Sequence, residues 1–177
     1  VKFCAPVLSS LAALRTGCGW ASLAVPQTAN PHPNTFVPPE LTFEDFFSSG
    51  KLDVPAWDHF LSTRHVKALV IGCGCVEQPL TSEAIEVLLK FNREEGFVVL
   101  DAGALLRVLD LLPDGCFDPT RCVLTPHPGE WLKLQIPPLS CPSSIEDLAE
   151  LQSLALKKGV TLVYKNATPT IISRDEV

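Results

Sequence analysis

Blocks of apolar residues along this chain switch between the spacing of strands and the spacing of helices. Two continuous apolar runs, Val66–Ile71 (broken only by Lys67) and Phe97–Leu100, have the length and composition of buried strands. Between them, apolar residues in the range 84–91 recur at helical spacing. The Val66–Ile71 run is apolar enough to predict a strand that is covered on both of its faces.

The same two patterns extend over most of the chain. Further strands are predicted at Trp20–Val25, Arg121–Thr125, Val160–Tyr164 and Thr170–Ser173. Helices are predicted through 5–12, after Asp53, after Thr81 or Ser82, over Ala104–Leu111, and after Ser143, where Glu146 completes a capping box. The proline-rich stretch Gln27–Pro39 predicts a loop, with a weak strand pattern only at Thr35–Val37.

Alternation of strands and helices is typical of α/β proteins with right-handed crossovers. We therefore predict an α/β fold: a three-layer sandwich with a mostly parallel central sheet. At 177 residues, the chain predicts a single domain spanning 1–177.

The composition limits the classes of molecule that this protein is expected to bind. The hydrophobic fraction is 46% and the charged fraction 19%, as in globular proteins, and the net charge is −6 without a cluster of Lys or Arg. This argues against a nucleic acid or an anionic membrane surface as partner. A phosphorylated small molecule stays open, because backbone amides and helix N-termini bind phosphate without net positive charge. No segment has the length and apolarity of a membrane span.

The seven cysteines form neither a CxxC pair nor an even set, so neither a zinc site nor a disulfide framework is predicted. We interpret them, Cys18 and Cys122 included, as small buried residues of a protein in a reducing compartment, the cytoplasm.

Polar residues directly follow several predicted strands. They are Gly72–Gly74, Asp101, Thr125–Glu130 and Lys165. In a parallel sheet these strand ends lie on one edge, which is where open α/β sheets bind ligands. We therefore predict that Gly74, Asp101, His127 and Lys165 line one cleft. Asp101 would accept a hydrogen bond from a ligand hydroxyl or hold a metal-bound water, and Lys165 would pair with phosphate.

Each of these groups also has a purely structural interpretation. The glycines suit a tight strand-to-helix turn, Asp101 suits a cap, and Lys165 alone suits a solvated surface position. Pro126 and Pro128 fix the backbone around His127, and Glu130 lies in the first turn of the following helix, near the positive end of its dipole. Their convergence on one edge favours the functional interpretation.

Three motifs, in order, resemble one family. They are Leu69-Val70-Ile71-Gly72-Cys73-Gly74, Val98-Val99-Leu100-Asp101-Ala102-Gly103-Ala104-Leu105 and Val123-Leu124-Thr125-Pro126-His127-Pro128-Gly129-Glu130. Together with the early helix and its Gly17-Cys18-Gly19 turn, they resemble the ADP/ATP-dependent NAD(P)H-hydrate dehydratases of the ribokinase-like superfamily.

The resemblance implies a repair reaction in which hydrated NADH or NADPH loses the hydroxyl on its nicotinamide ring at the expense of ADP or ATP with Mg²⁺. The hydroxyl is phosphorylated and then eliminated. The expected substrate-binding residues are Ala5, Gly72, Gly74, Asp101, His127 and Glu130. The expected nucleotide-binding residues are Lys165, Asn166, Ala167, Thr168 and Pro169. By analogy with bacterial members, the resemblance also suggests a homo-oligomer.

The chain departs from the family pattern at several positions. Cys73, Cys75 and Val76 replace residues of the usual second glycine turn, and Gly103 and Leu106 replace an aspartate and an asparagine. The family's Gly-Ser-Gly-Asp segment with the catalytic aspartate would lie beyond Val177, and its first strand before Val1, so we expect an incomplete domain whose own turnover is negligible. The alternatives are a non-catalytic nucleotide-binding or interaction relative and, with less support, a small-molecule kinase of the same fold.

Overall fold

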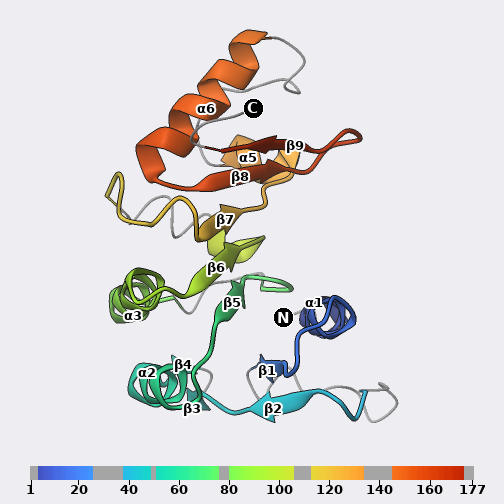
Figure 1. Ribbon diagram of the computed structural model, residues 1–177, viewed down its shortest axis with the longest axis vertical. Helices are drawn as coiled ribbons and strands as arrows, with labels where there is room; N and C mark the ends of the chain where they lie inside the picture. The colour runs from blue at the N-terminus through green and yellow to red at the C-terminus, as the bar shows by residue number, and fades with distance from the viewer. Residues whose placement is uncertain are drawn as a thin grey trace.

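A computed structural model of the chain describes residues 4–25, 38–48, 51–75, 80–105, 113–133 and 145–173. Its helices are α1 Cys4–Arg15, α2 Val54–Thr63, α3 Ser82–Arg93, α5 Pro128–Lys133 and α6 Ile145–Lys158. Its strands are β1 Ser22–Ala24, β2 Thr42–Glu44, β3 Phe47–Ser48, β4 Lys51–Leu52, β5 Ala68–Ile71, β6 Phe97–Leu100, β7 Cys122–Leu124, β8 Thr161–Tyr164 and β9 Thr170–Ile172 (Figure 1).

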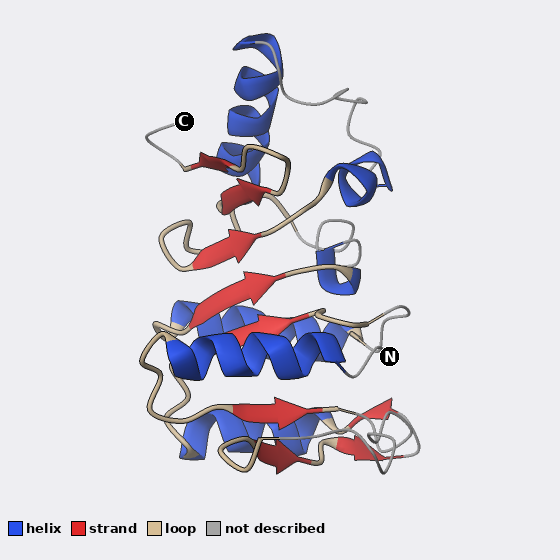
Figure 2. Ribbon diagram, turned by 90° about the vertical axis from the view of Figure 1, so that its right-hand side faces the viewer, coloured by secondary structure: helices blue, strands red, loops and turns tan. Residues whose placement is uncertain are grey.

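The predicted central sheet is confirmed. Five strands pair in the order β5-β6-β7-β8-β9, and all pairs are parallel except β8 with β9. Helices α3 and α6 lie on one side of this sheet and α1 on the other, so helices flank both sides of the sheet, as expected for the predicted three-layer sandwich (Figures 1 and 2). The two small sheets, β1-β2 and β3-β4, include the short strands β2, β3 and β4, which the sequence pattern did not predict.

Two helices begin where the sequence predicts. The Asp53 carboxylate accepts from Ala56 N at 3.0 Å at the start of α2, and the Thr81 hydroxyl accepts from Ala84 N at 3.3 Å at the start of α3. A capping hydrogen bond of this kind stabilises a helix by about 1 kcal/mol. The predicted strand at Thr35–Val37, the predicted helix beyond residue 105 and the Ser143 cap lie outside the described residues.

The two faces of the sheet differ in burial. One face presents fully buried side chains: Val98, Leu100, Cys122, Leu124, Leu162 and Ile172. On the other face Val70, Phe97 and Ile171 are 53%, 52% and 61% exposed. The prediction that the Val66–Ile71 run is covered on both faces is therefore wrong in this structure. β5 ends the five-stranded sheet, and α1 packs mainly against β1 through Val7, Leu23 and Leu41.

Backbone hydrogen bonds continue past the strands and join their carboxyl ends. Asp101 N donates to Ile71 O at 2.9 Å, Thr125 N to Leu100 O at 3.1 Å, and Lys165 N to Pro126 O at 2.8 Å. These bonds place the residues that follow β5, β6, β7 and β8 side by side along one edge of the sheet. None of the described helices combines the length and the apolarity needed to cross a bilayer.

Candidate functional site

Gly72 sets the close approach of the first two strand ends. Its φ is +106°, and a Cβ atom added there would lie 1.8 Å from Asp101 O and 2.8 Å from Ala104 N. Only glycine fits such a backbone and such a contact. The glycine requirement at Gly72 thus comes from the protein's own backbone, and this turn brings the following residue, Cys73, beside Asp101.

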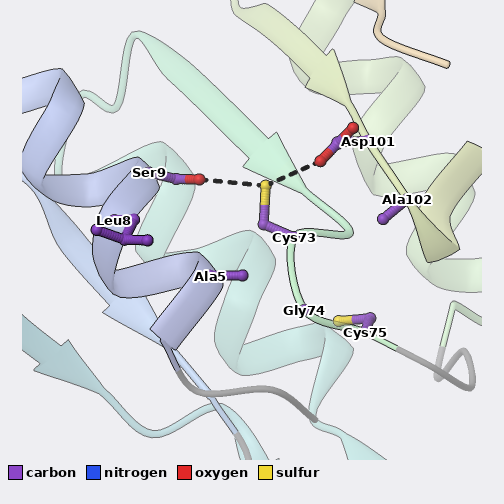
Figure 3. A pocket seen from close by; sticks show the side chains of 8 residues that line it. All are labelled: Ala5, Leu8, Ser9, Cys73, Gly74, Cys75, Asp101 and Ala102. Atoms are coloured by element: carbon purple, nitrogen blue, oxygen red, sulfur yellow. Dashed lines mark hydrogen bonds between the residues drawn. The ribbon is translucent and has the colours of Figure 1, made fainter. Parts of the chain in front are cut away.

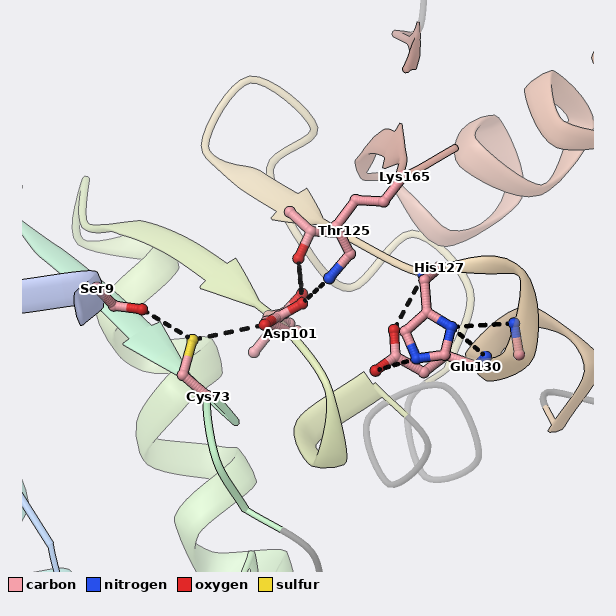
Figure 4. A network of polar contacts seen from close by, with 9 residues as sticks. Ser9, Cys73, Asp101, Thr125, His127, Glu130 and Lys165 are labelled. Carbon is pink, nitrogen blue, oxygen red and sulfur yellow. Dashed lines mark hydrogen bonds and ion pairs between the residues drawn. The ribbon is translucent and has the colours of Figure 1, made fainter. Parts of the chain in front are cut away.

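Asp101 is the centre of a polar cluster drawn from five elements (Figure 4). Its Oδ1 accepts from Lys165 Nζ at 2.5 Å and from Thr125 Oγ1 at 2.7 Å. Its Oδ2 accepts from Cys73 Sγ at 3.5 Å, and Cys73 Sγ in turn accepts from the Ser9 hydroxyl at 3.2 Å. The cluster therefore runs from α1, across the ends of β5, β6 and β7, to the end of β8.

The electrostatics of the cluster follow from these contacts. Burial opposes ionisation of Asp101, but the hydrogen bonds from Lys165, Thr125 and Cys73, together with the lysine charge, outweigh it and lower its pKa. Burial raises the pKa of the Cys73 thiol, and the nearby negative charge of Asp101 raises it further. At neutral pH the cluster thus contains an ionised carboxylate, which pairs with Lys165, and a neutral thiol that donates to the carboxylate.

A pocket of about 430 Å³ opens beside this cluster (Figure 3). Its lining combines α1 with the ends of β5 and β6: Ala5, Leu8, Ser9, Cys73, Gly74, Cys75, Asp101 and Ala102. The pocket therefore offers an apolar wall from α1 and the Asp101 carboxylate as a hydrogen-bond acceptor. Its volume lies in the range of small-molecule sites.

His127 forms a second, separate cluster at the start of α5. Its Nδ1 accepts from Gly129 N at 3.0 Å and from Glu130 N at 3.3 Å, while Glu130 Oε2 accepts from His127 N at 2.9 Å. This is a reciprocal capping box with histidine as the cap and Pro128 as the first helical residue. The other ring nitrogen, Nε2, lies 3.2 Å from Glu130 Oε1.

The structure thus brings together part of the predicted site. Ala5, Gly74 and Asp101 line the pocket, and Lys165 contacts Asp101 directly. His127 and Glu130 lie at the same edge, beyond Thr125, but they are not among the residues that line this pocket. Asn166, Ala167, Thr168 and Pro169 form the turn between β8 and β9, and the Asn166 side chain accepts from Ala167 N at 2.8 Å.

Sequence reasoning missed the roles of Ser9 and Cys73, because each depends on a contact between distant segments. It also misplaced most cysteines. Cys122 is buried as predicted, but Cys18 and Cys4 are exposed, and Cys73, Cys75 and Cys116 are partly exposed. Cys18 follows the Gly17 turn at the exposed end of α1, so its apolar neighbours in the sequence do not enclose it.

Comparisons with known proteins agree on one family. The family model described as NAD(P)H-hydrate dehydratase matches residues 3–177. An ATP-dependent (S)-NAD(P)H-hydrate dehydratase from Ajellomyces capsulatus is 37% identical over 119 residues, which are 63% of this chain and 32% of the relative. An ADP-dependent (S)-NAD(P)H-hydrate dehydratase from Cenarchaeum symbiosum is 29% identical over 94% of this chain and 56% of the relative.

Solved structures show the same fold. A ribokinase-like superfamily protein from Enterococcus faecalis superposes with a TM-score of 0.69 at 21% identity, covering 98% of this chain and 56% of that one. The ADP/ATP-dependent NAD(P)H-hydrate dehydratase from Bacillus subtilis, co-crystallised with ATP and Mg²⁺, superposes with a TM-score of 0.64 at 21% identity. This match covers 99% of this chain and 57% of that one. The chain spans little more than half the length of these structures. Its sequence match over 3–177 shows that the chain belongs to the NAD(P)H-hydrate dehydratase family.

Proposed function

We propose that this chain takes part, as a single ribokinase-like domain, in the nucleotide-dependent dehydration of hydrated NADH or NADPH. The observation that carries the proposal is the position of Asp101, which lines the pocket and also holds Lys165. One carboxylate thus joins a site for a hydroxyl-bearing ligand to a lysine suited to phosphate. Dehydration driven by a nucleotide needs those two sites to be adjacent.

The roles of the residues follow from their chemistry. Asp101 accepts a hydrogen bond from the hydroxyl of the hydrated ring, while Ala5 and Gly74 shape the wall that holds it. Gly72 keeps the two strand ends in contact, and His127 with Glu130 fixes the loop beside Thr125. Rate enhancement would come chiefly from positioning the hydroxyl and from neutralising charge on phosphate.

The nucleotide is assigned to Lys165 and the turn Asn166–Pro169. Lys165 provides a half-exposed ammonium, with 42% of its side chain accessible, which suits a phosphate oxygen. No group of three or more side chains suited to holding a metal ion occurs in the described part of the chain. Mg²⁺ would therefore be held mainly by the phosphates, as is usual for this ion, and would supply charge neutralisation there.

The test is recovery of NADH absorbance from its hydrate, with ADP or ATP and Mg²⁺, by the chain together with any native residues that follow Val177. Nucleotide-dependent recovery that is lost in Asp101→Ala supports the proposal. Asp114→Asn is a matched control, because Asp114 pairs with Lys157 and Lys158 on the surface. Binding of hydrate and nucleotide without turnover would favour the alternative, a non-catalytic relative. A phosphorylated sugar or vitamin precursor as product would favour a small-molecule kinase.

Two further proposals concern the setting of the protein. A cytoplasmic location is supported by the cysteines, since the six in the described residues are all free thiols. A homo-oligomer rests on analogy with bacterial members, and sedimentation of the purified chain would test it.

A further inference from the structure

The Asp101 carboxylate serves two neighbours at once. Its side chain is 23% exposed and lines the pocket, while its Oδ1 holds the ammonium of Lys165. A ligand hydroxyl that donates to this carboxylate from the pocket weakens its hold on Lys165, because the negative charge is then shared with another donor. Conversely, a phosphate that binds Lys165 weakens the hold of the ammonium on Asp101. Both ligands therefore weaken the same ion pair.

The surroundings confine that change to one side chain. Thr125 and Cys73 donate to the carboxylate from two other strand ends, so Asp101 stays in place when Lys165 leaves. The backbone of Lys165 is fixed by its hydrogen bond to Pro126 O. The part that is free to move is the flexible four-carbon stem of the lysine, which can turn its ammonium from Asp101 to a phosphate.

We propose that the Asp101–Lys165 ion pair couples the two ligand sites, so that a hydroxyl-bearing ligand in the pocket and an anion at Lys165 bind with positive cooperativity. The coupling rests on the proposed function, which supplies these two ligand classes. Its origin is thermodynamic: the first ligand bears the cost of separating the pair, and the second does not. Linkage requires that each ligand improve the affinity of the other by the same factor.

The experiment is a binding cycle by calorimetry. Inorganic tripolyphosphate is the anion probe and hydrated NADH the pocket probe, both with EDTA present so that Mg²⁺-dependent turnover does not occur. With hydrated NADH saturating, tripolyphosphate should bind about threefold to fivefold more tightly, the effect expected for a partly exposed ion pair. Titration in the opposite order should give the same factor.

Two variants assign the coupling to this pair. In Asp101→Asn the factor should fall to about one, because neutral asparagine no longer holds the lysine charge. In Lys165→Gln, tripolyphosphate should likewise leave the affinity for hydrated NADH unchanged. This second variant replaces the first as the test if Asp101→Asn does not fold. Asp114→Asn removes the same charge from a remote surface ion pair and should keep the wild-type factor.

The outcomes separate the coupling from the function. If both probes bind the wild-type chain independently, or if the factor persists in Asp101→Asn, the coupling is wrong while the proposed ligands stand. If neither probe binds the wild-type chain, the proposed function and the coupling both fall. A reciprocal factor that disappears in both variants but not in Asp114→Asn establishes the coupling.

Discussion

The Asp101 cluster and the His127 cluster lie at the same edge of the sheet, but they are built in opposite ways. Asp101 contacts side chains that are 24, 28 and 64 positions away in the sequence. In the described part of the chain, the hydrogen bonds of His127 go to groups no more than four positions away. The first cluster exists only when the sheet is assembled, whereas the second needs little more than the first turn of α5.

Because of this difference, the two clusters should respond differently when the fold is weakened. A change that loosens the contacts between strands should disperse the Asp101 cluster and leave the His127 capping box largely intact, since local and long-range structure differ in stability. The ligand binding that we propose at Asp101 would thus be a sensitive measure of tertiary order. The cap at His127 measures local helix structure.

The largest effect is expected for Gly72→Ala. Its new methyl group would overlap Asp101 O, which lies 1.8 Å from the Cβ position, in a backbone conformation that alanine avoids. We expect a loss of about 3 kcal/mol or more in the free energy of unfolding, measured by urea denaturation. The long-range cluster should be lost with it, and tripolyphosphate binding should fall accordingly.

Gly19→Ala is the matched control for Gly72→Ala. A Cβ added at Gly19 meets no atom within 4 Å, and its φ lies outside the region that favours glycine. The free energy of unfolding should change by no more than about 0.5 kcal/mol. Equal losses in the two variants would contradict the packing role of Gly72.

Asp101→Asn should give the next largest effect, and the effect should depend on pH. Because the folded state lowers the pKa of Asp101, the ionised carboxylate stabilises the fold above its unfolded pKa of about 4. That contribution is lost as the pH falls through the lower, folded pKa. At pH 7 the free energy of unfolding of the wild-type chain should be about 1 kcal/mol higher than that of the variant, after allowance for solvent screening of the half-exposed lysine.

The advantage of the wild-type chain over Asp101→Asn should shrink steadily below pH 4, as measured by urea unfolding at several pH values. Other carboxylates titrate in the same range, among them Asp114 and Asp118. They are common to both proteins, so the difference between the two curves isolates Asp101. A difference that does not vary with pH would show that the loss comes from shape and not from charge.

The same contrast explains what the sequence predicts well. Strand β6 is predicted to the residue, because Phe97–Leu100 is a short apolar run between Gly96 and Asp101. The edge that carries the proposed site follows from strand–helix alternation, which predicts that Asp101 and Lys165 lie near each other, and their side chains are in contact. What the pattern does not contain is pairing across the sheet. The Ser9–Cys73 contact depends on where α1 packs, and the exposure of Val70 depends on β5 lying at the end of the sheet.

His127→Ala should have a smaller and purely local effect. The variant loses the acceptor for Gly129 N and Glu130 N and the contact with Glu130 Oε1, so α5 should lose about 1 kcal/mol. His127→Asn keeps a capping acceptor, so its free energy of unfolding should fall by only a few tenths of a kcal/mol. Urea unfolding measures both, and equal losses would mean that the ring matters through contacts other than the cap.

Cys73→Ala should have the smallest effect, and it tests how far the Asp101 cluster extends. The variant removes a weak S–H donor from Asp101 Oδ2 and the acceptor for the Ser9 hydroxyl, so the free energy of unfolding should fall by only about 0.5 kcal/mol. The sharper measurement is the pKa of Asp101, followed by carboxyl ¹³C NMR. The thiol hydrogen bond helps to lower that pKa, so it should rise in Cys73→Ala.

Two further variants decide what a rise in the Asp101 pKa would mean. Cys73→Ser keeps a donor at the same position and should return the pKa of Asp101 towards its wild-type value. Cys75→Ala removes a thiol that lines the same pocket but has no hydrogen bond to Asp101 in the described part of the chain, so it should leave that pKa unchanged. If all three variants give the wild-type pKa, the cluster ends at Asp101, and α1 contributes only a wall of the pocket. If Cys73→Ser restores the pKa of Asp101 and Cys75→Ala does not change it, the cluster joins α1 to Lys165 through one continuous chain of hydrogen bonds. A ligand against α1 would then act on the lysine through the carboxylate that both ends share.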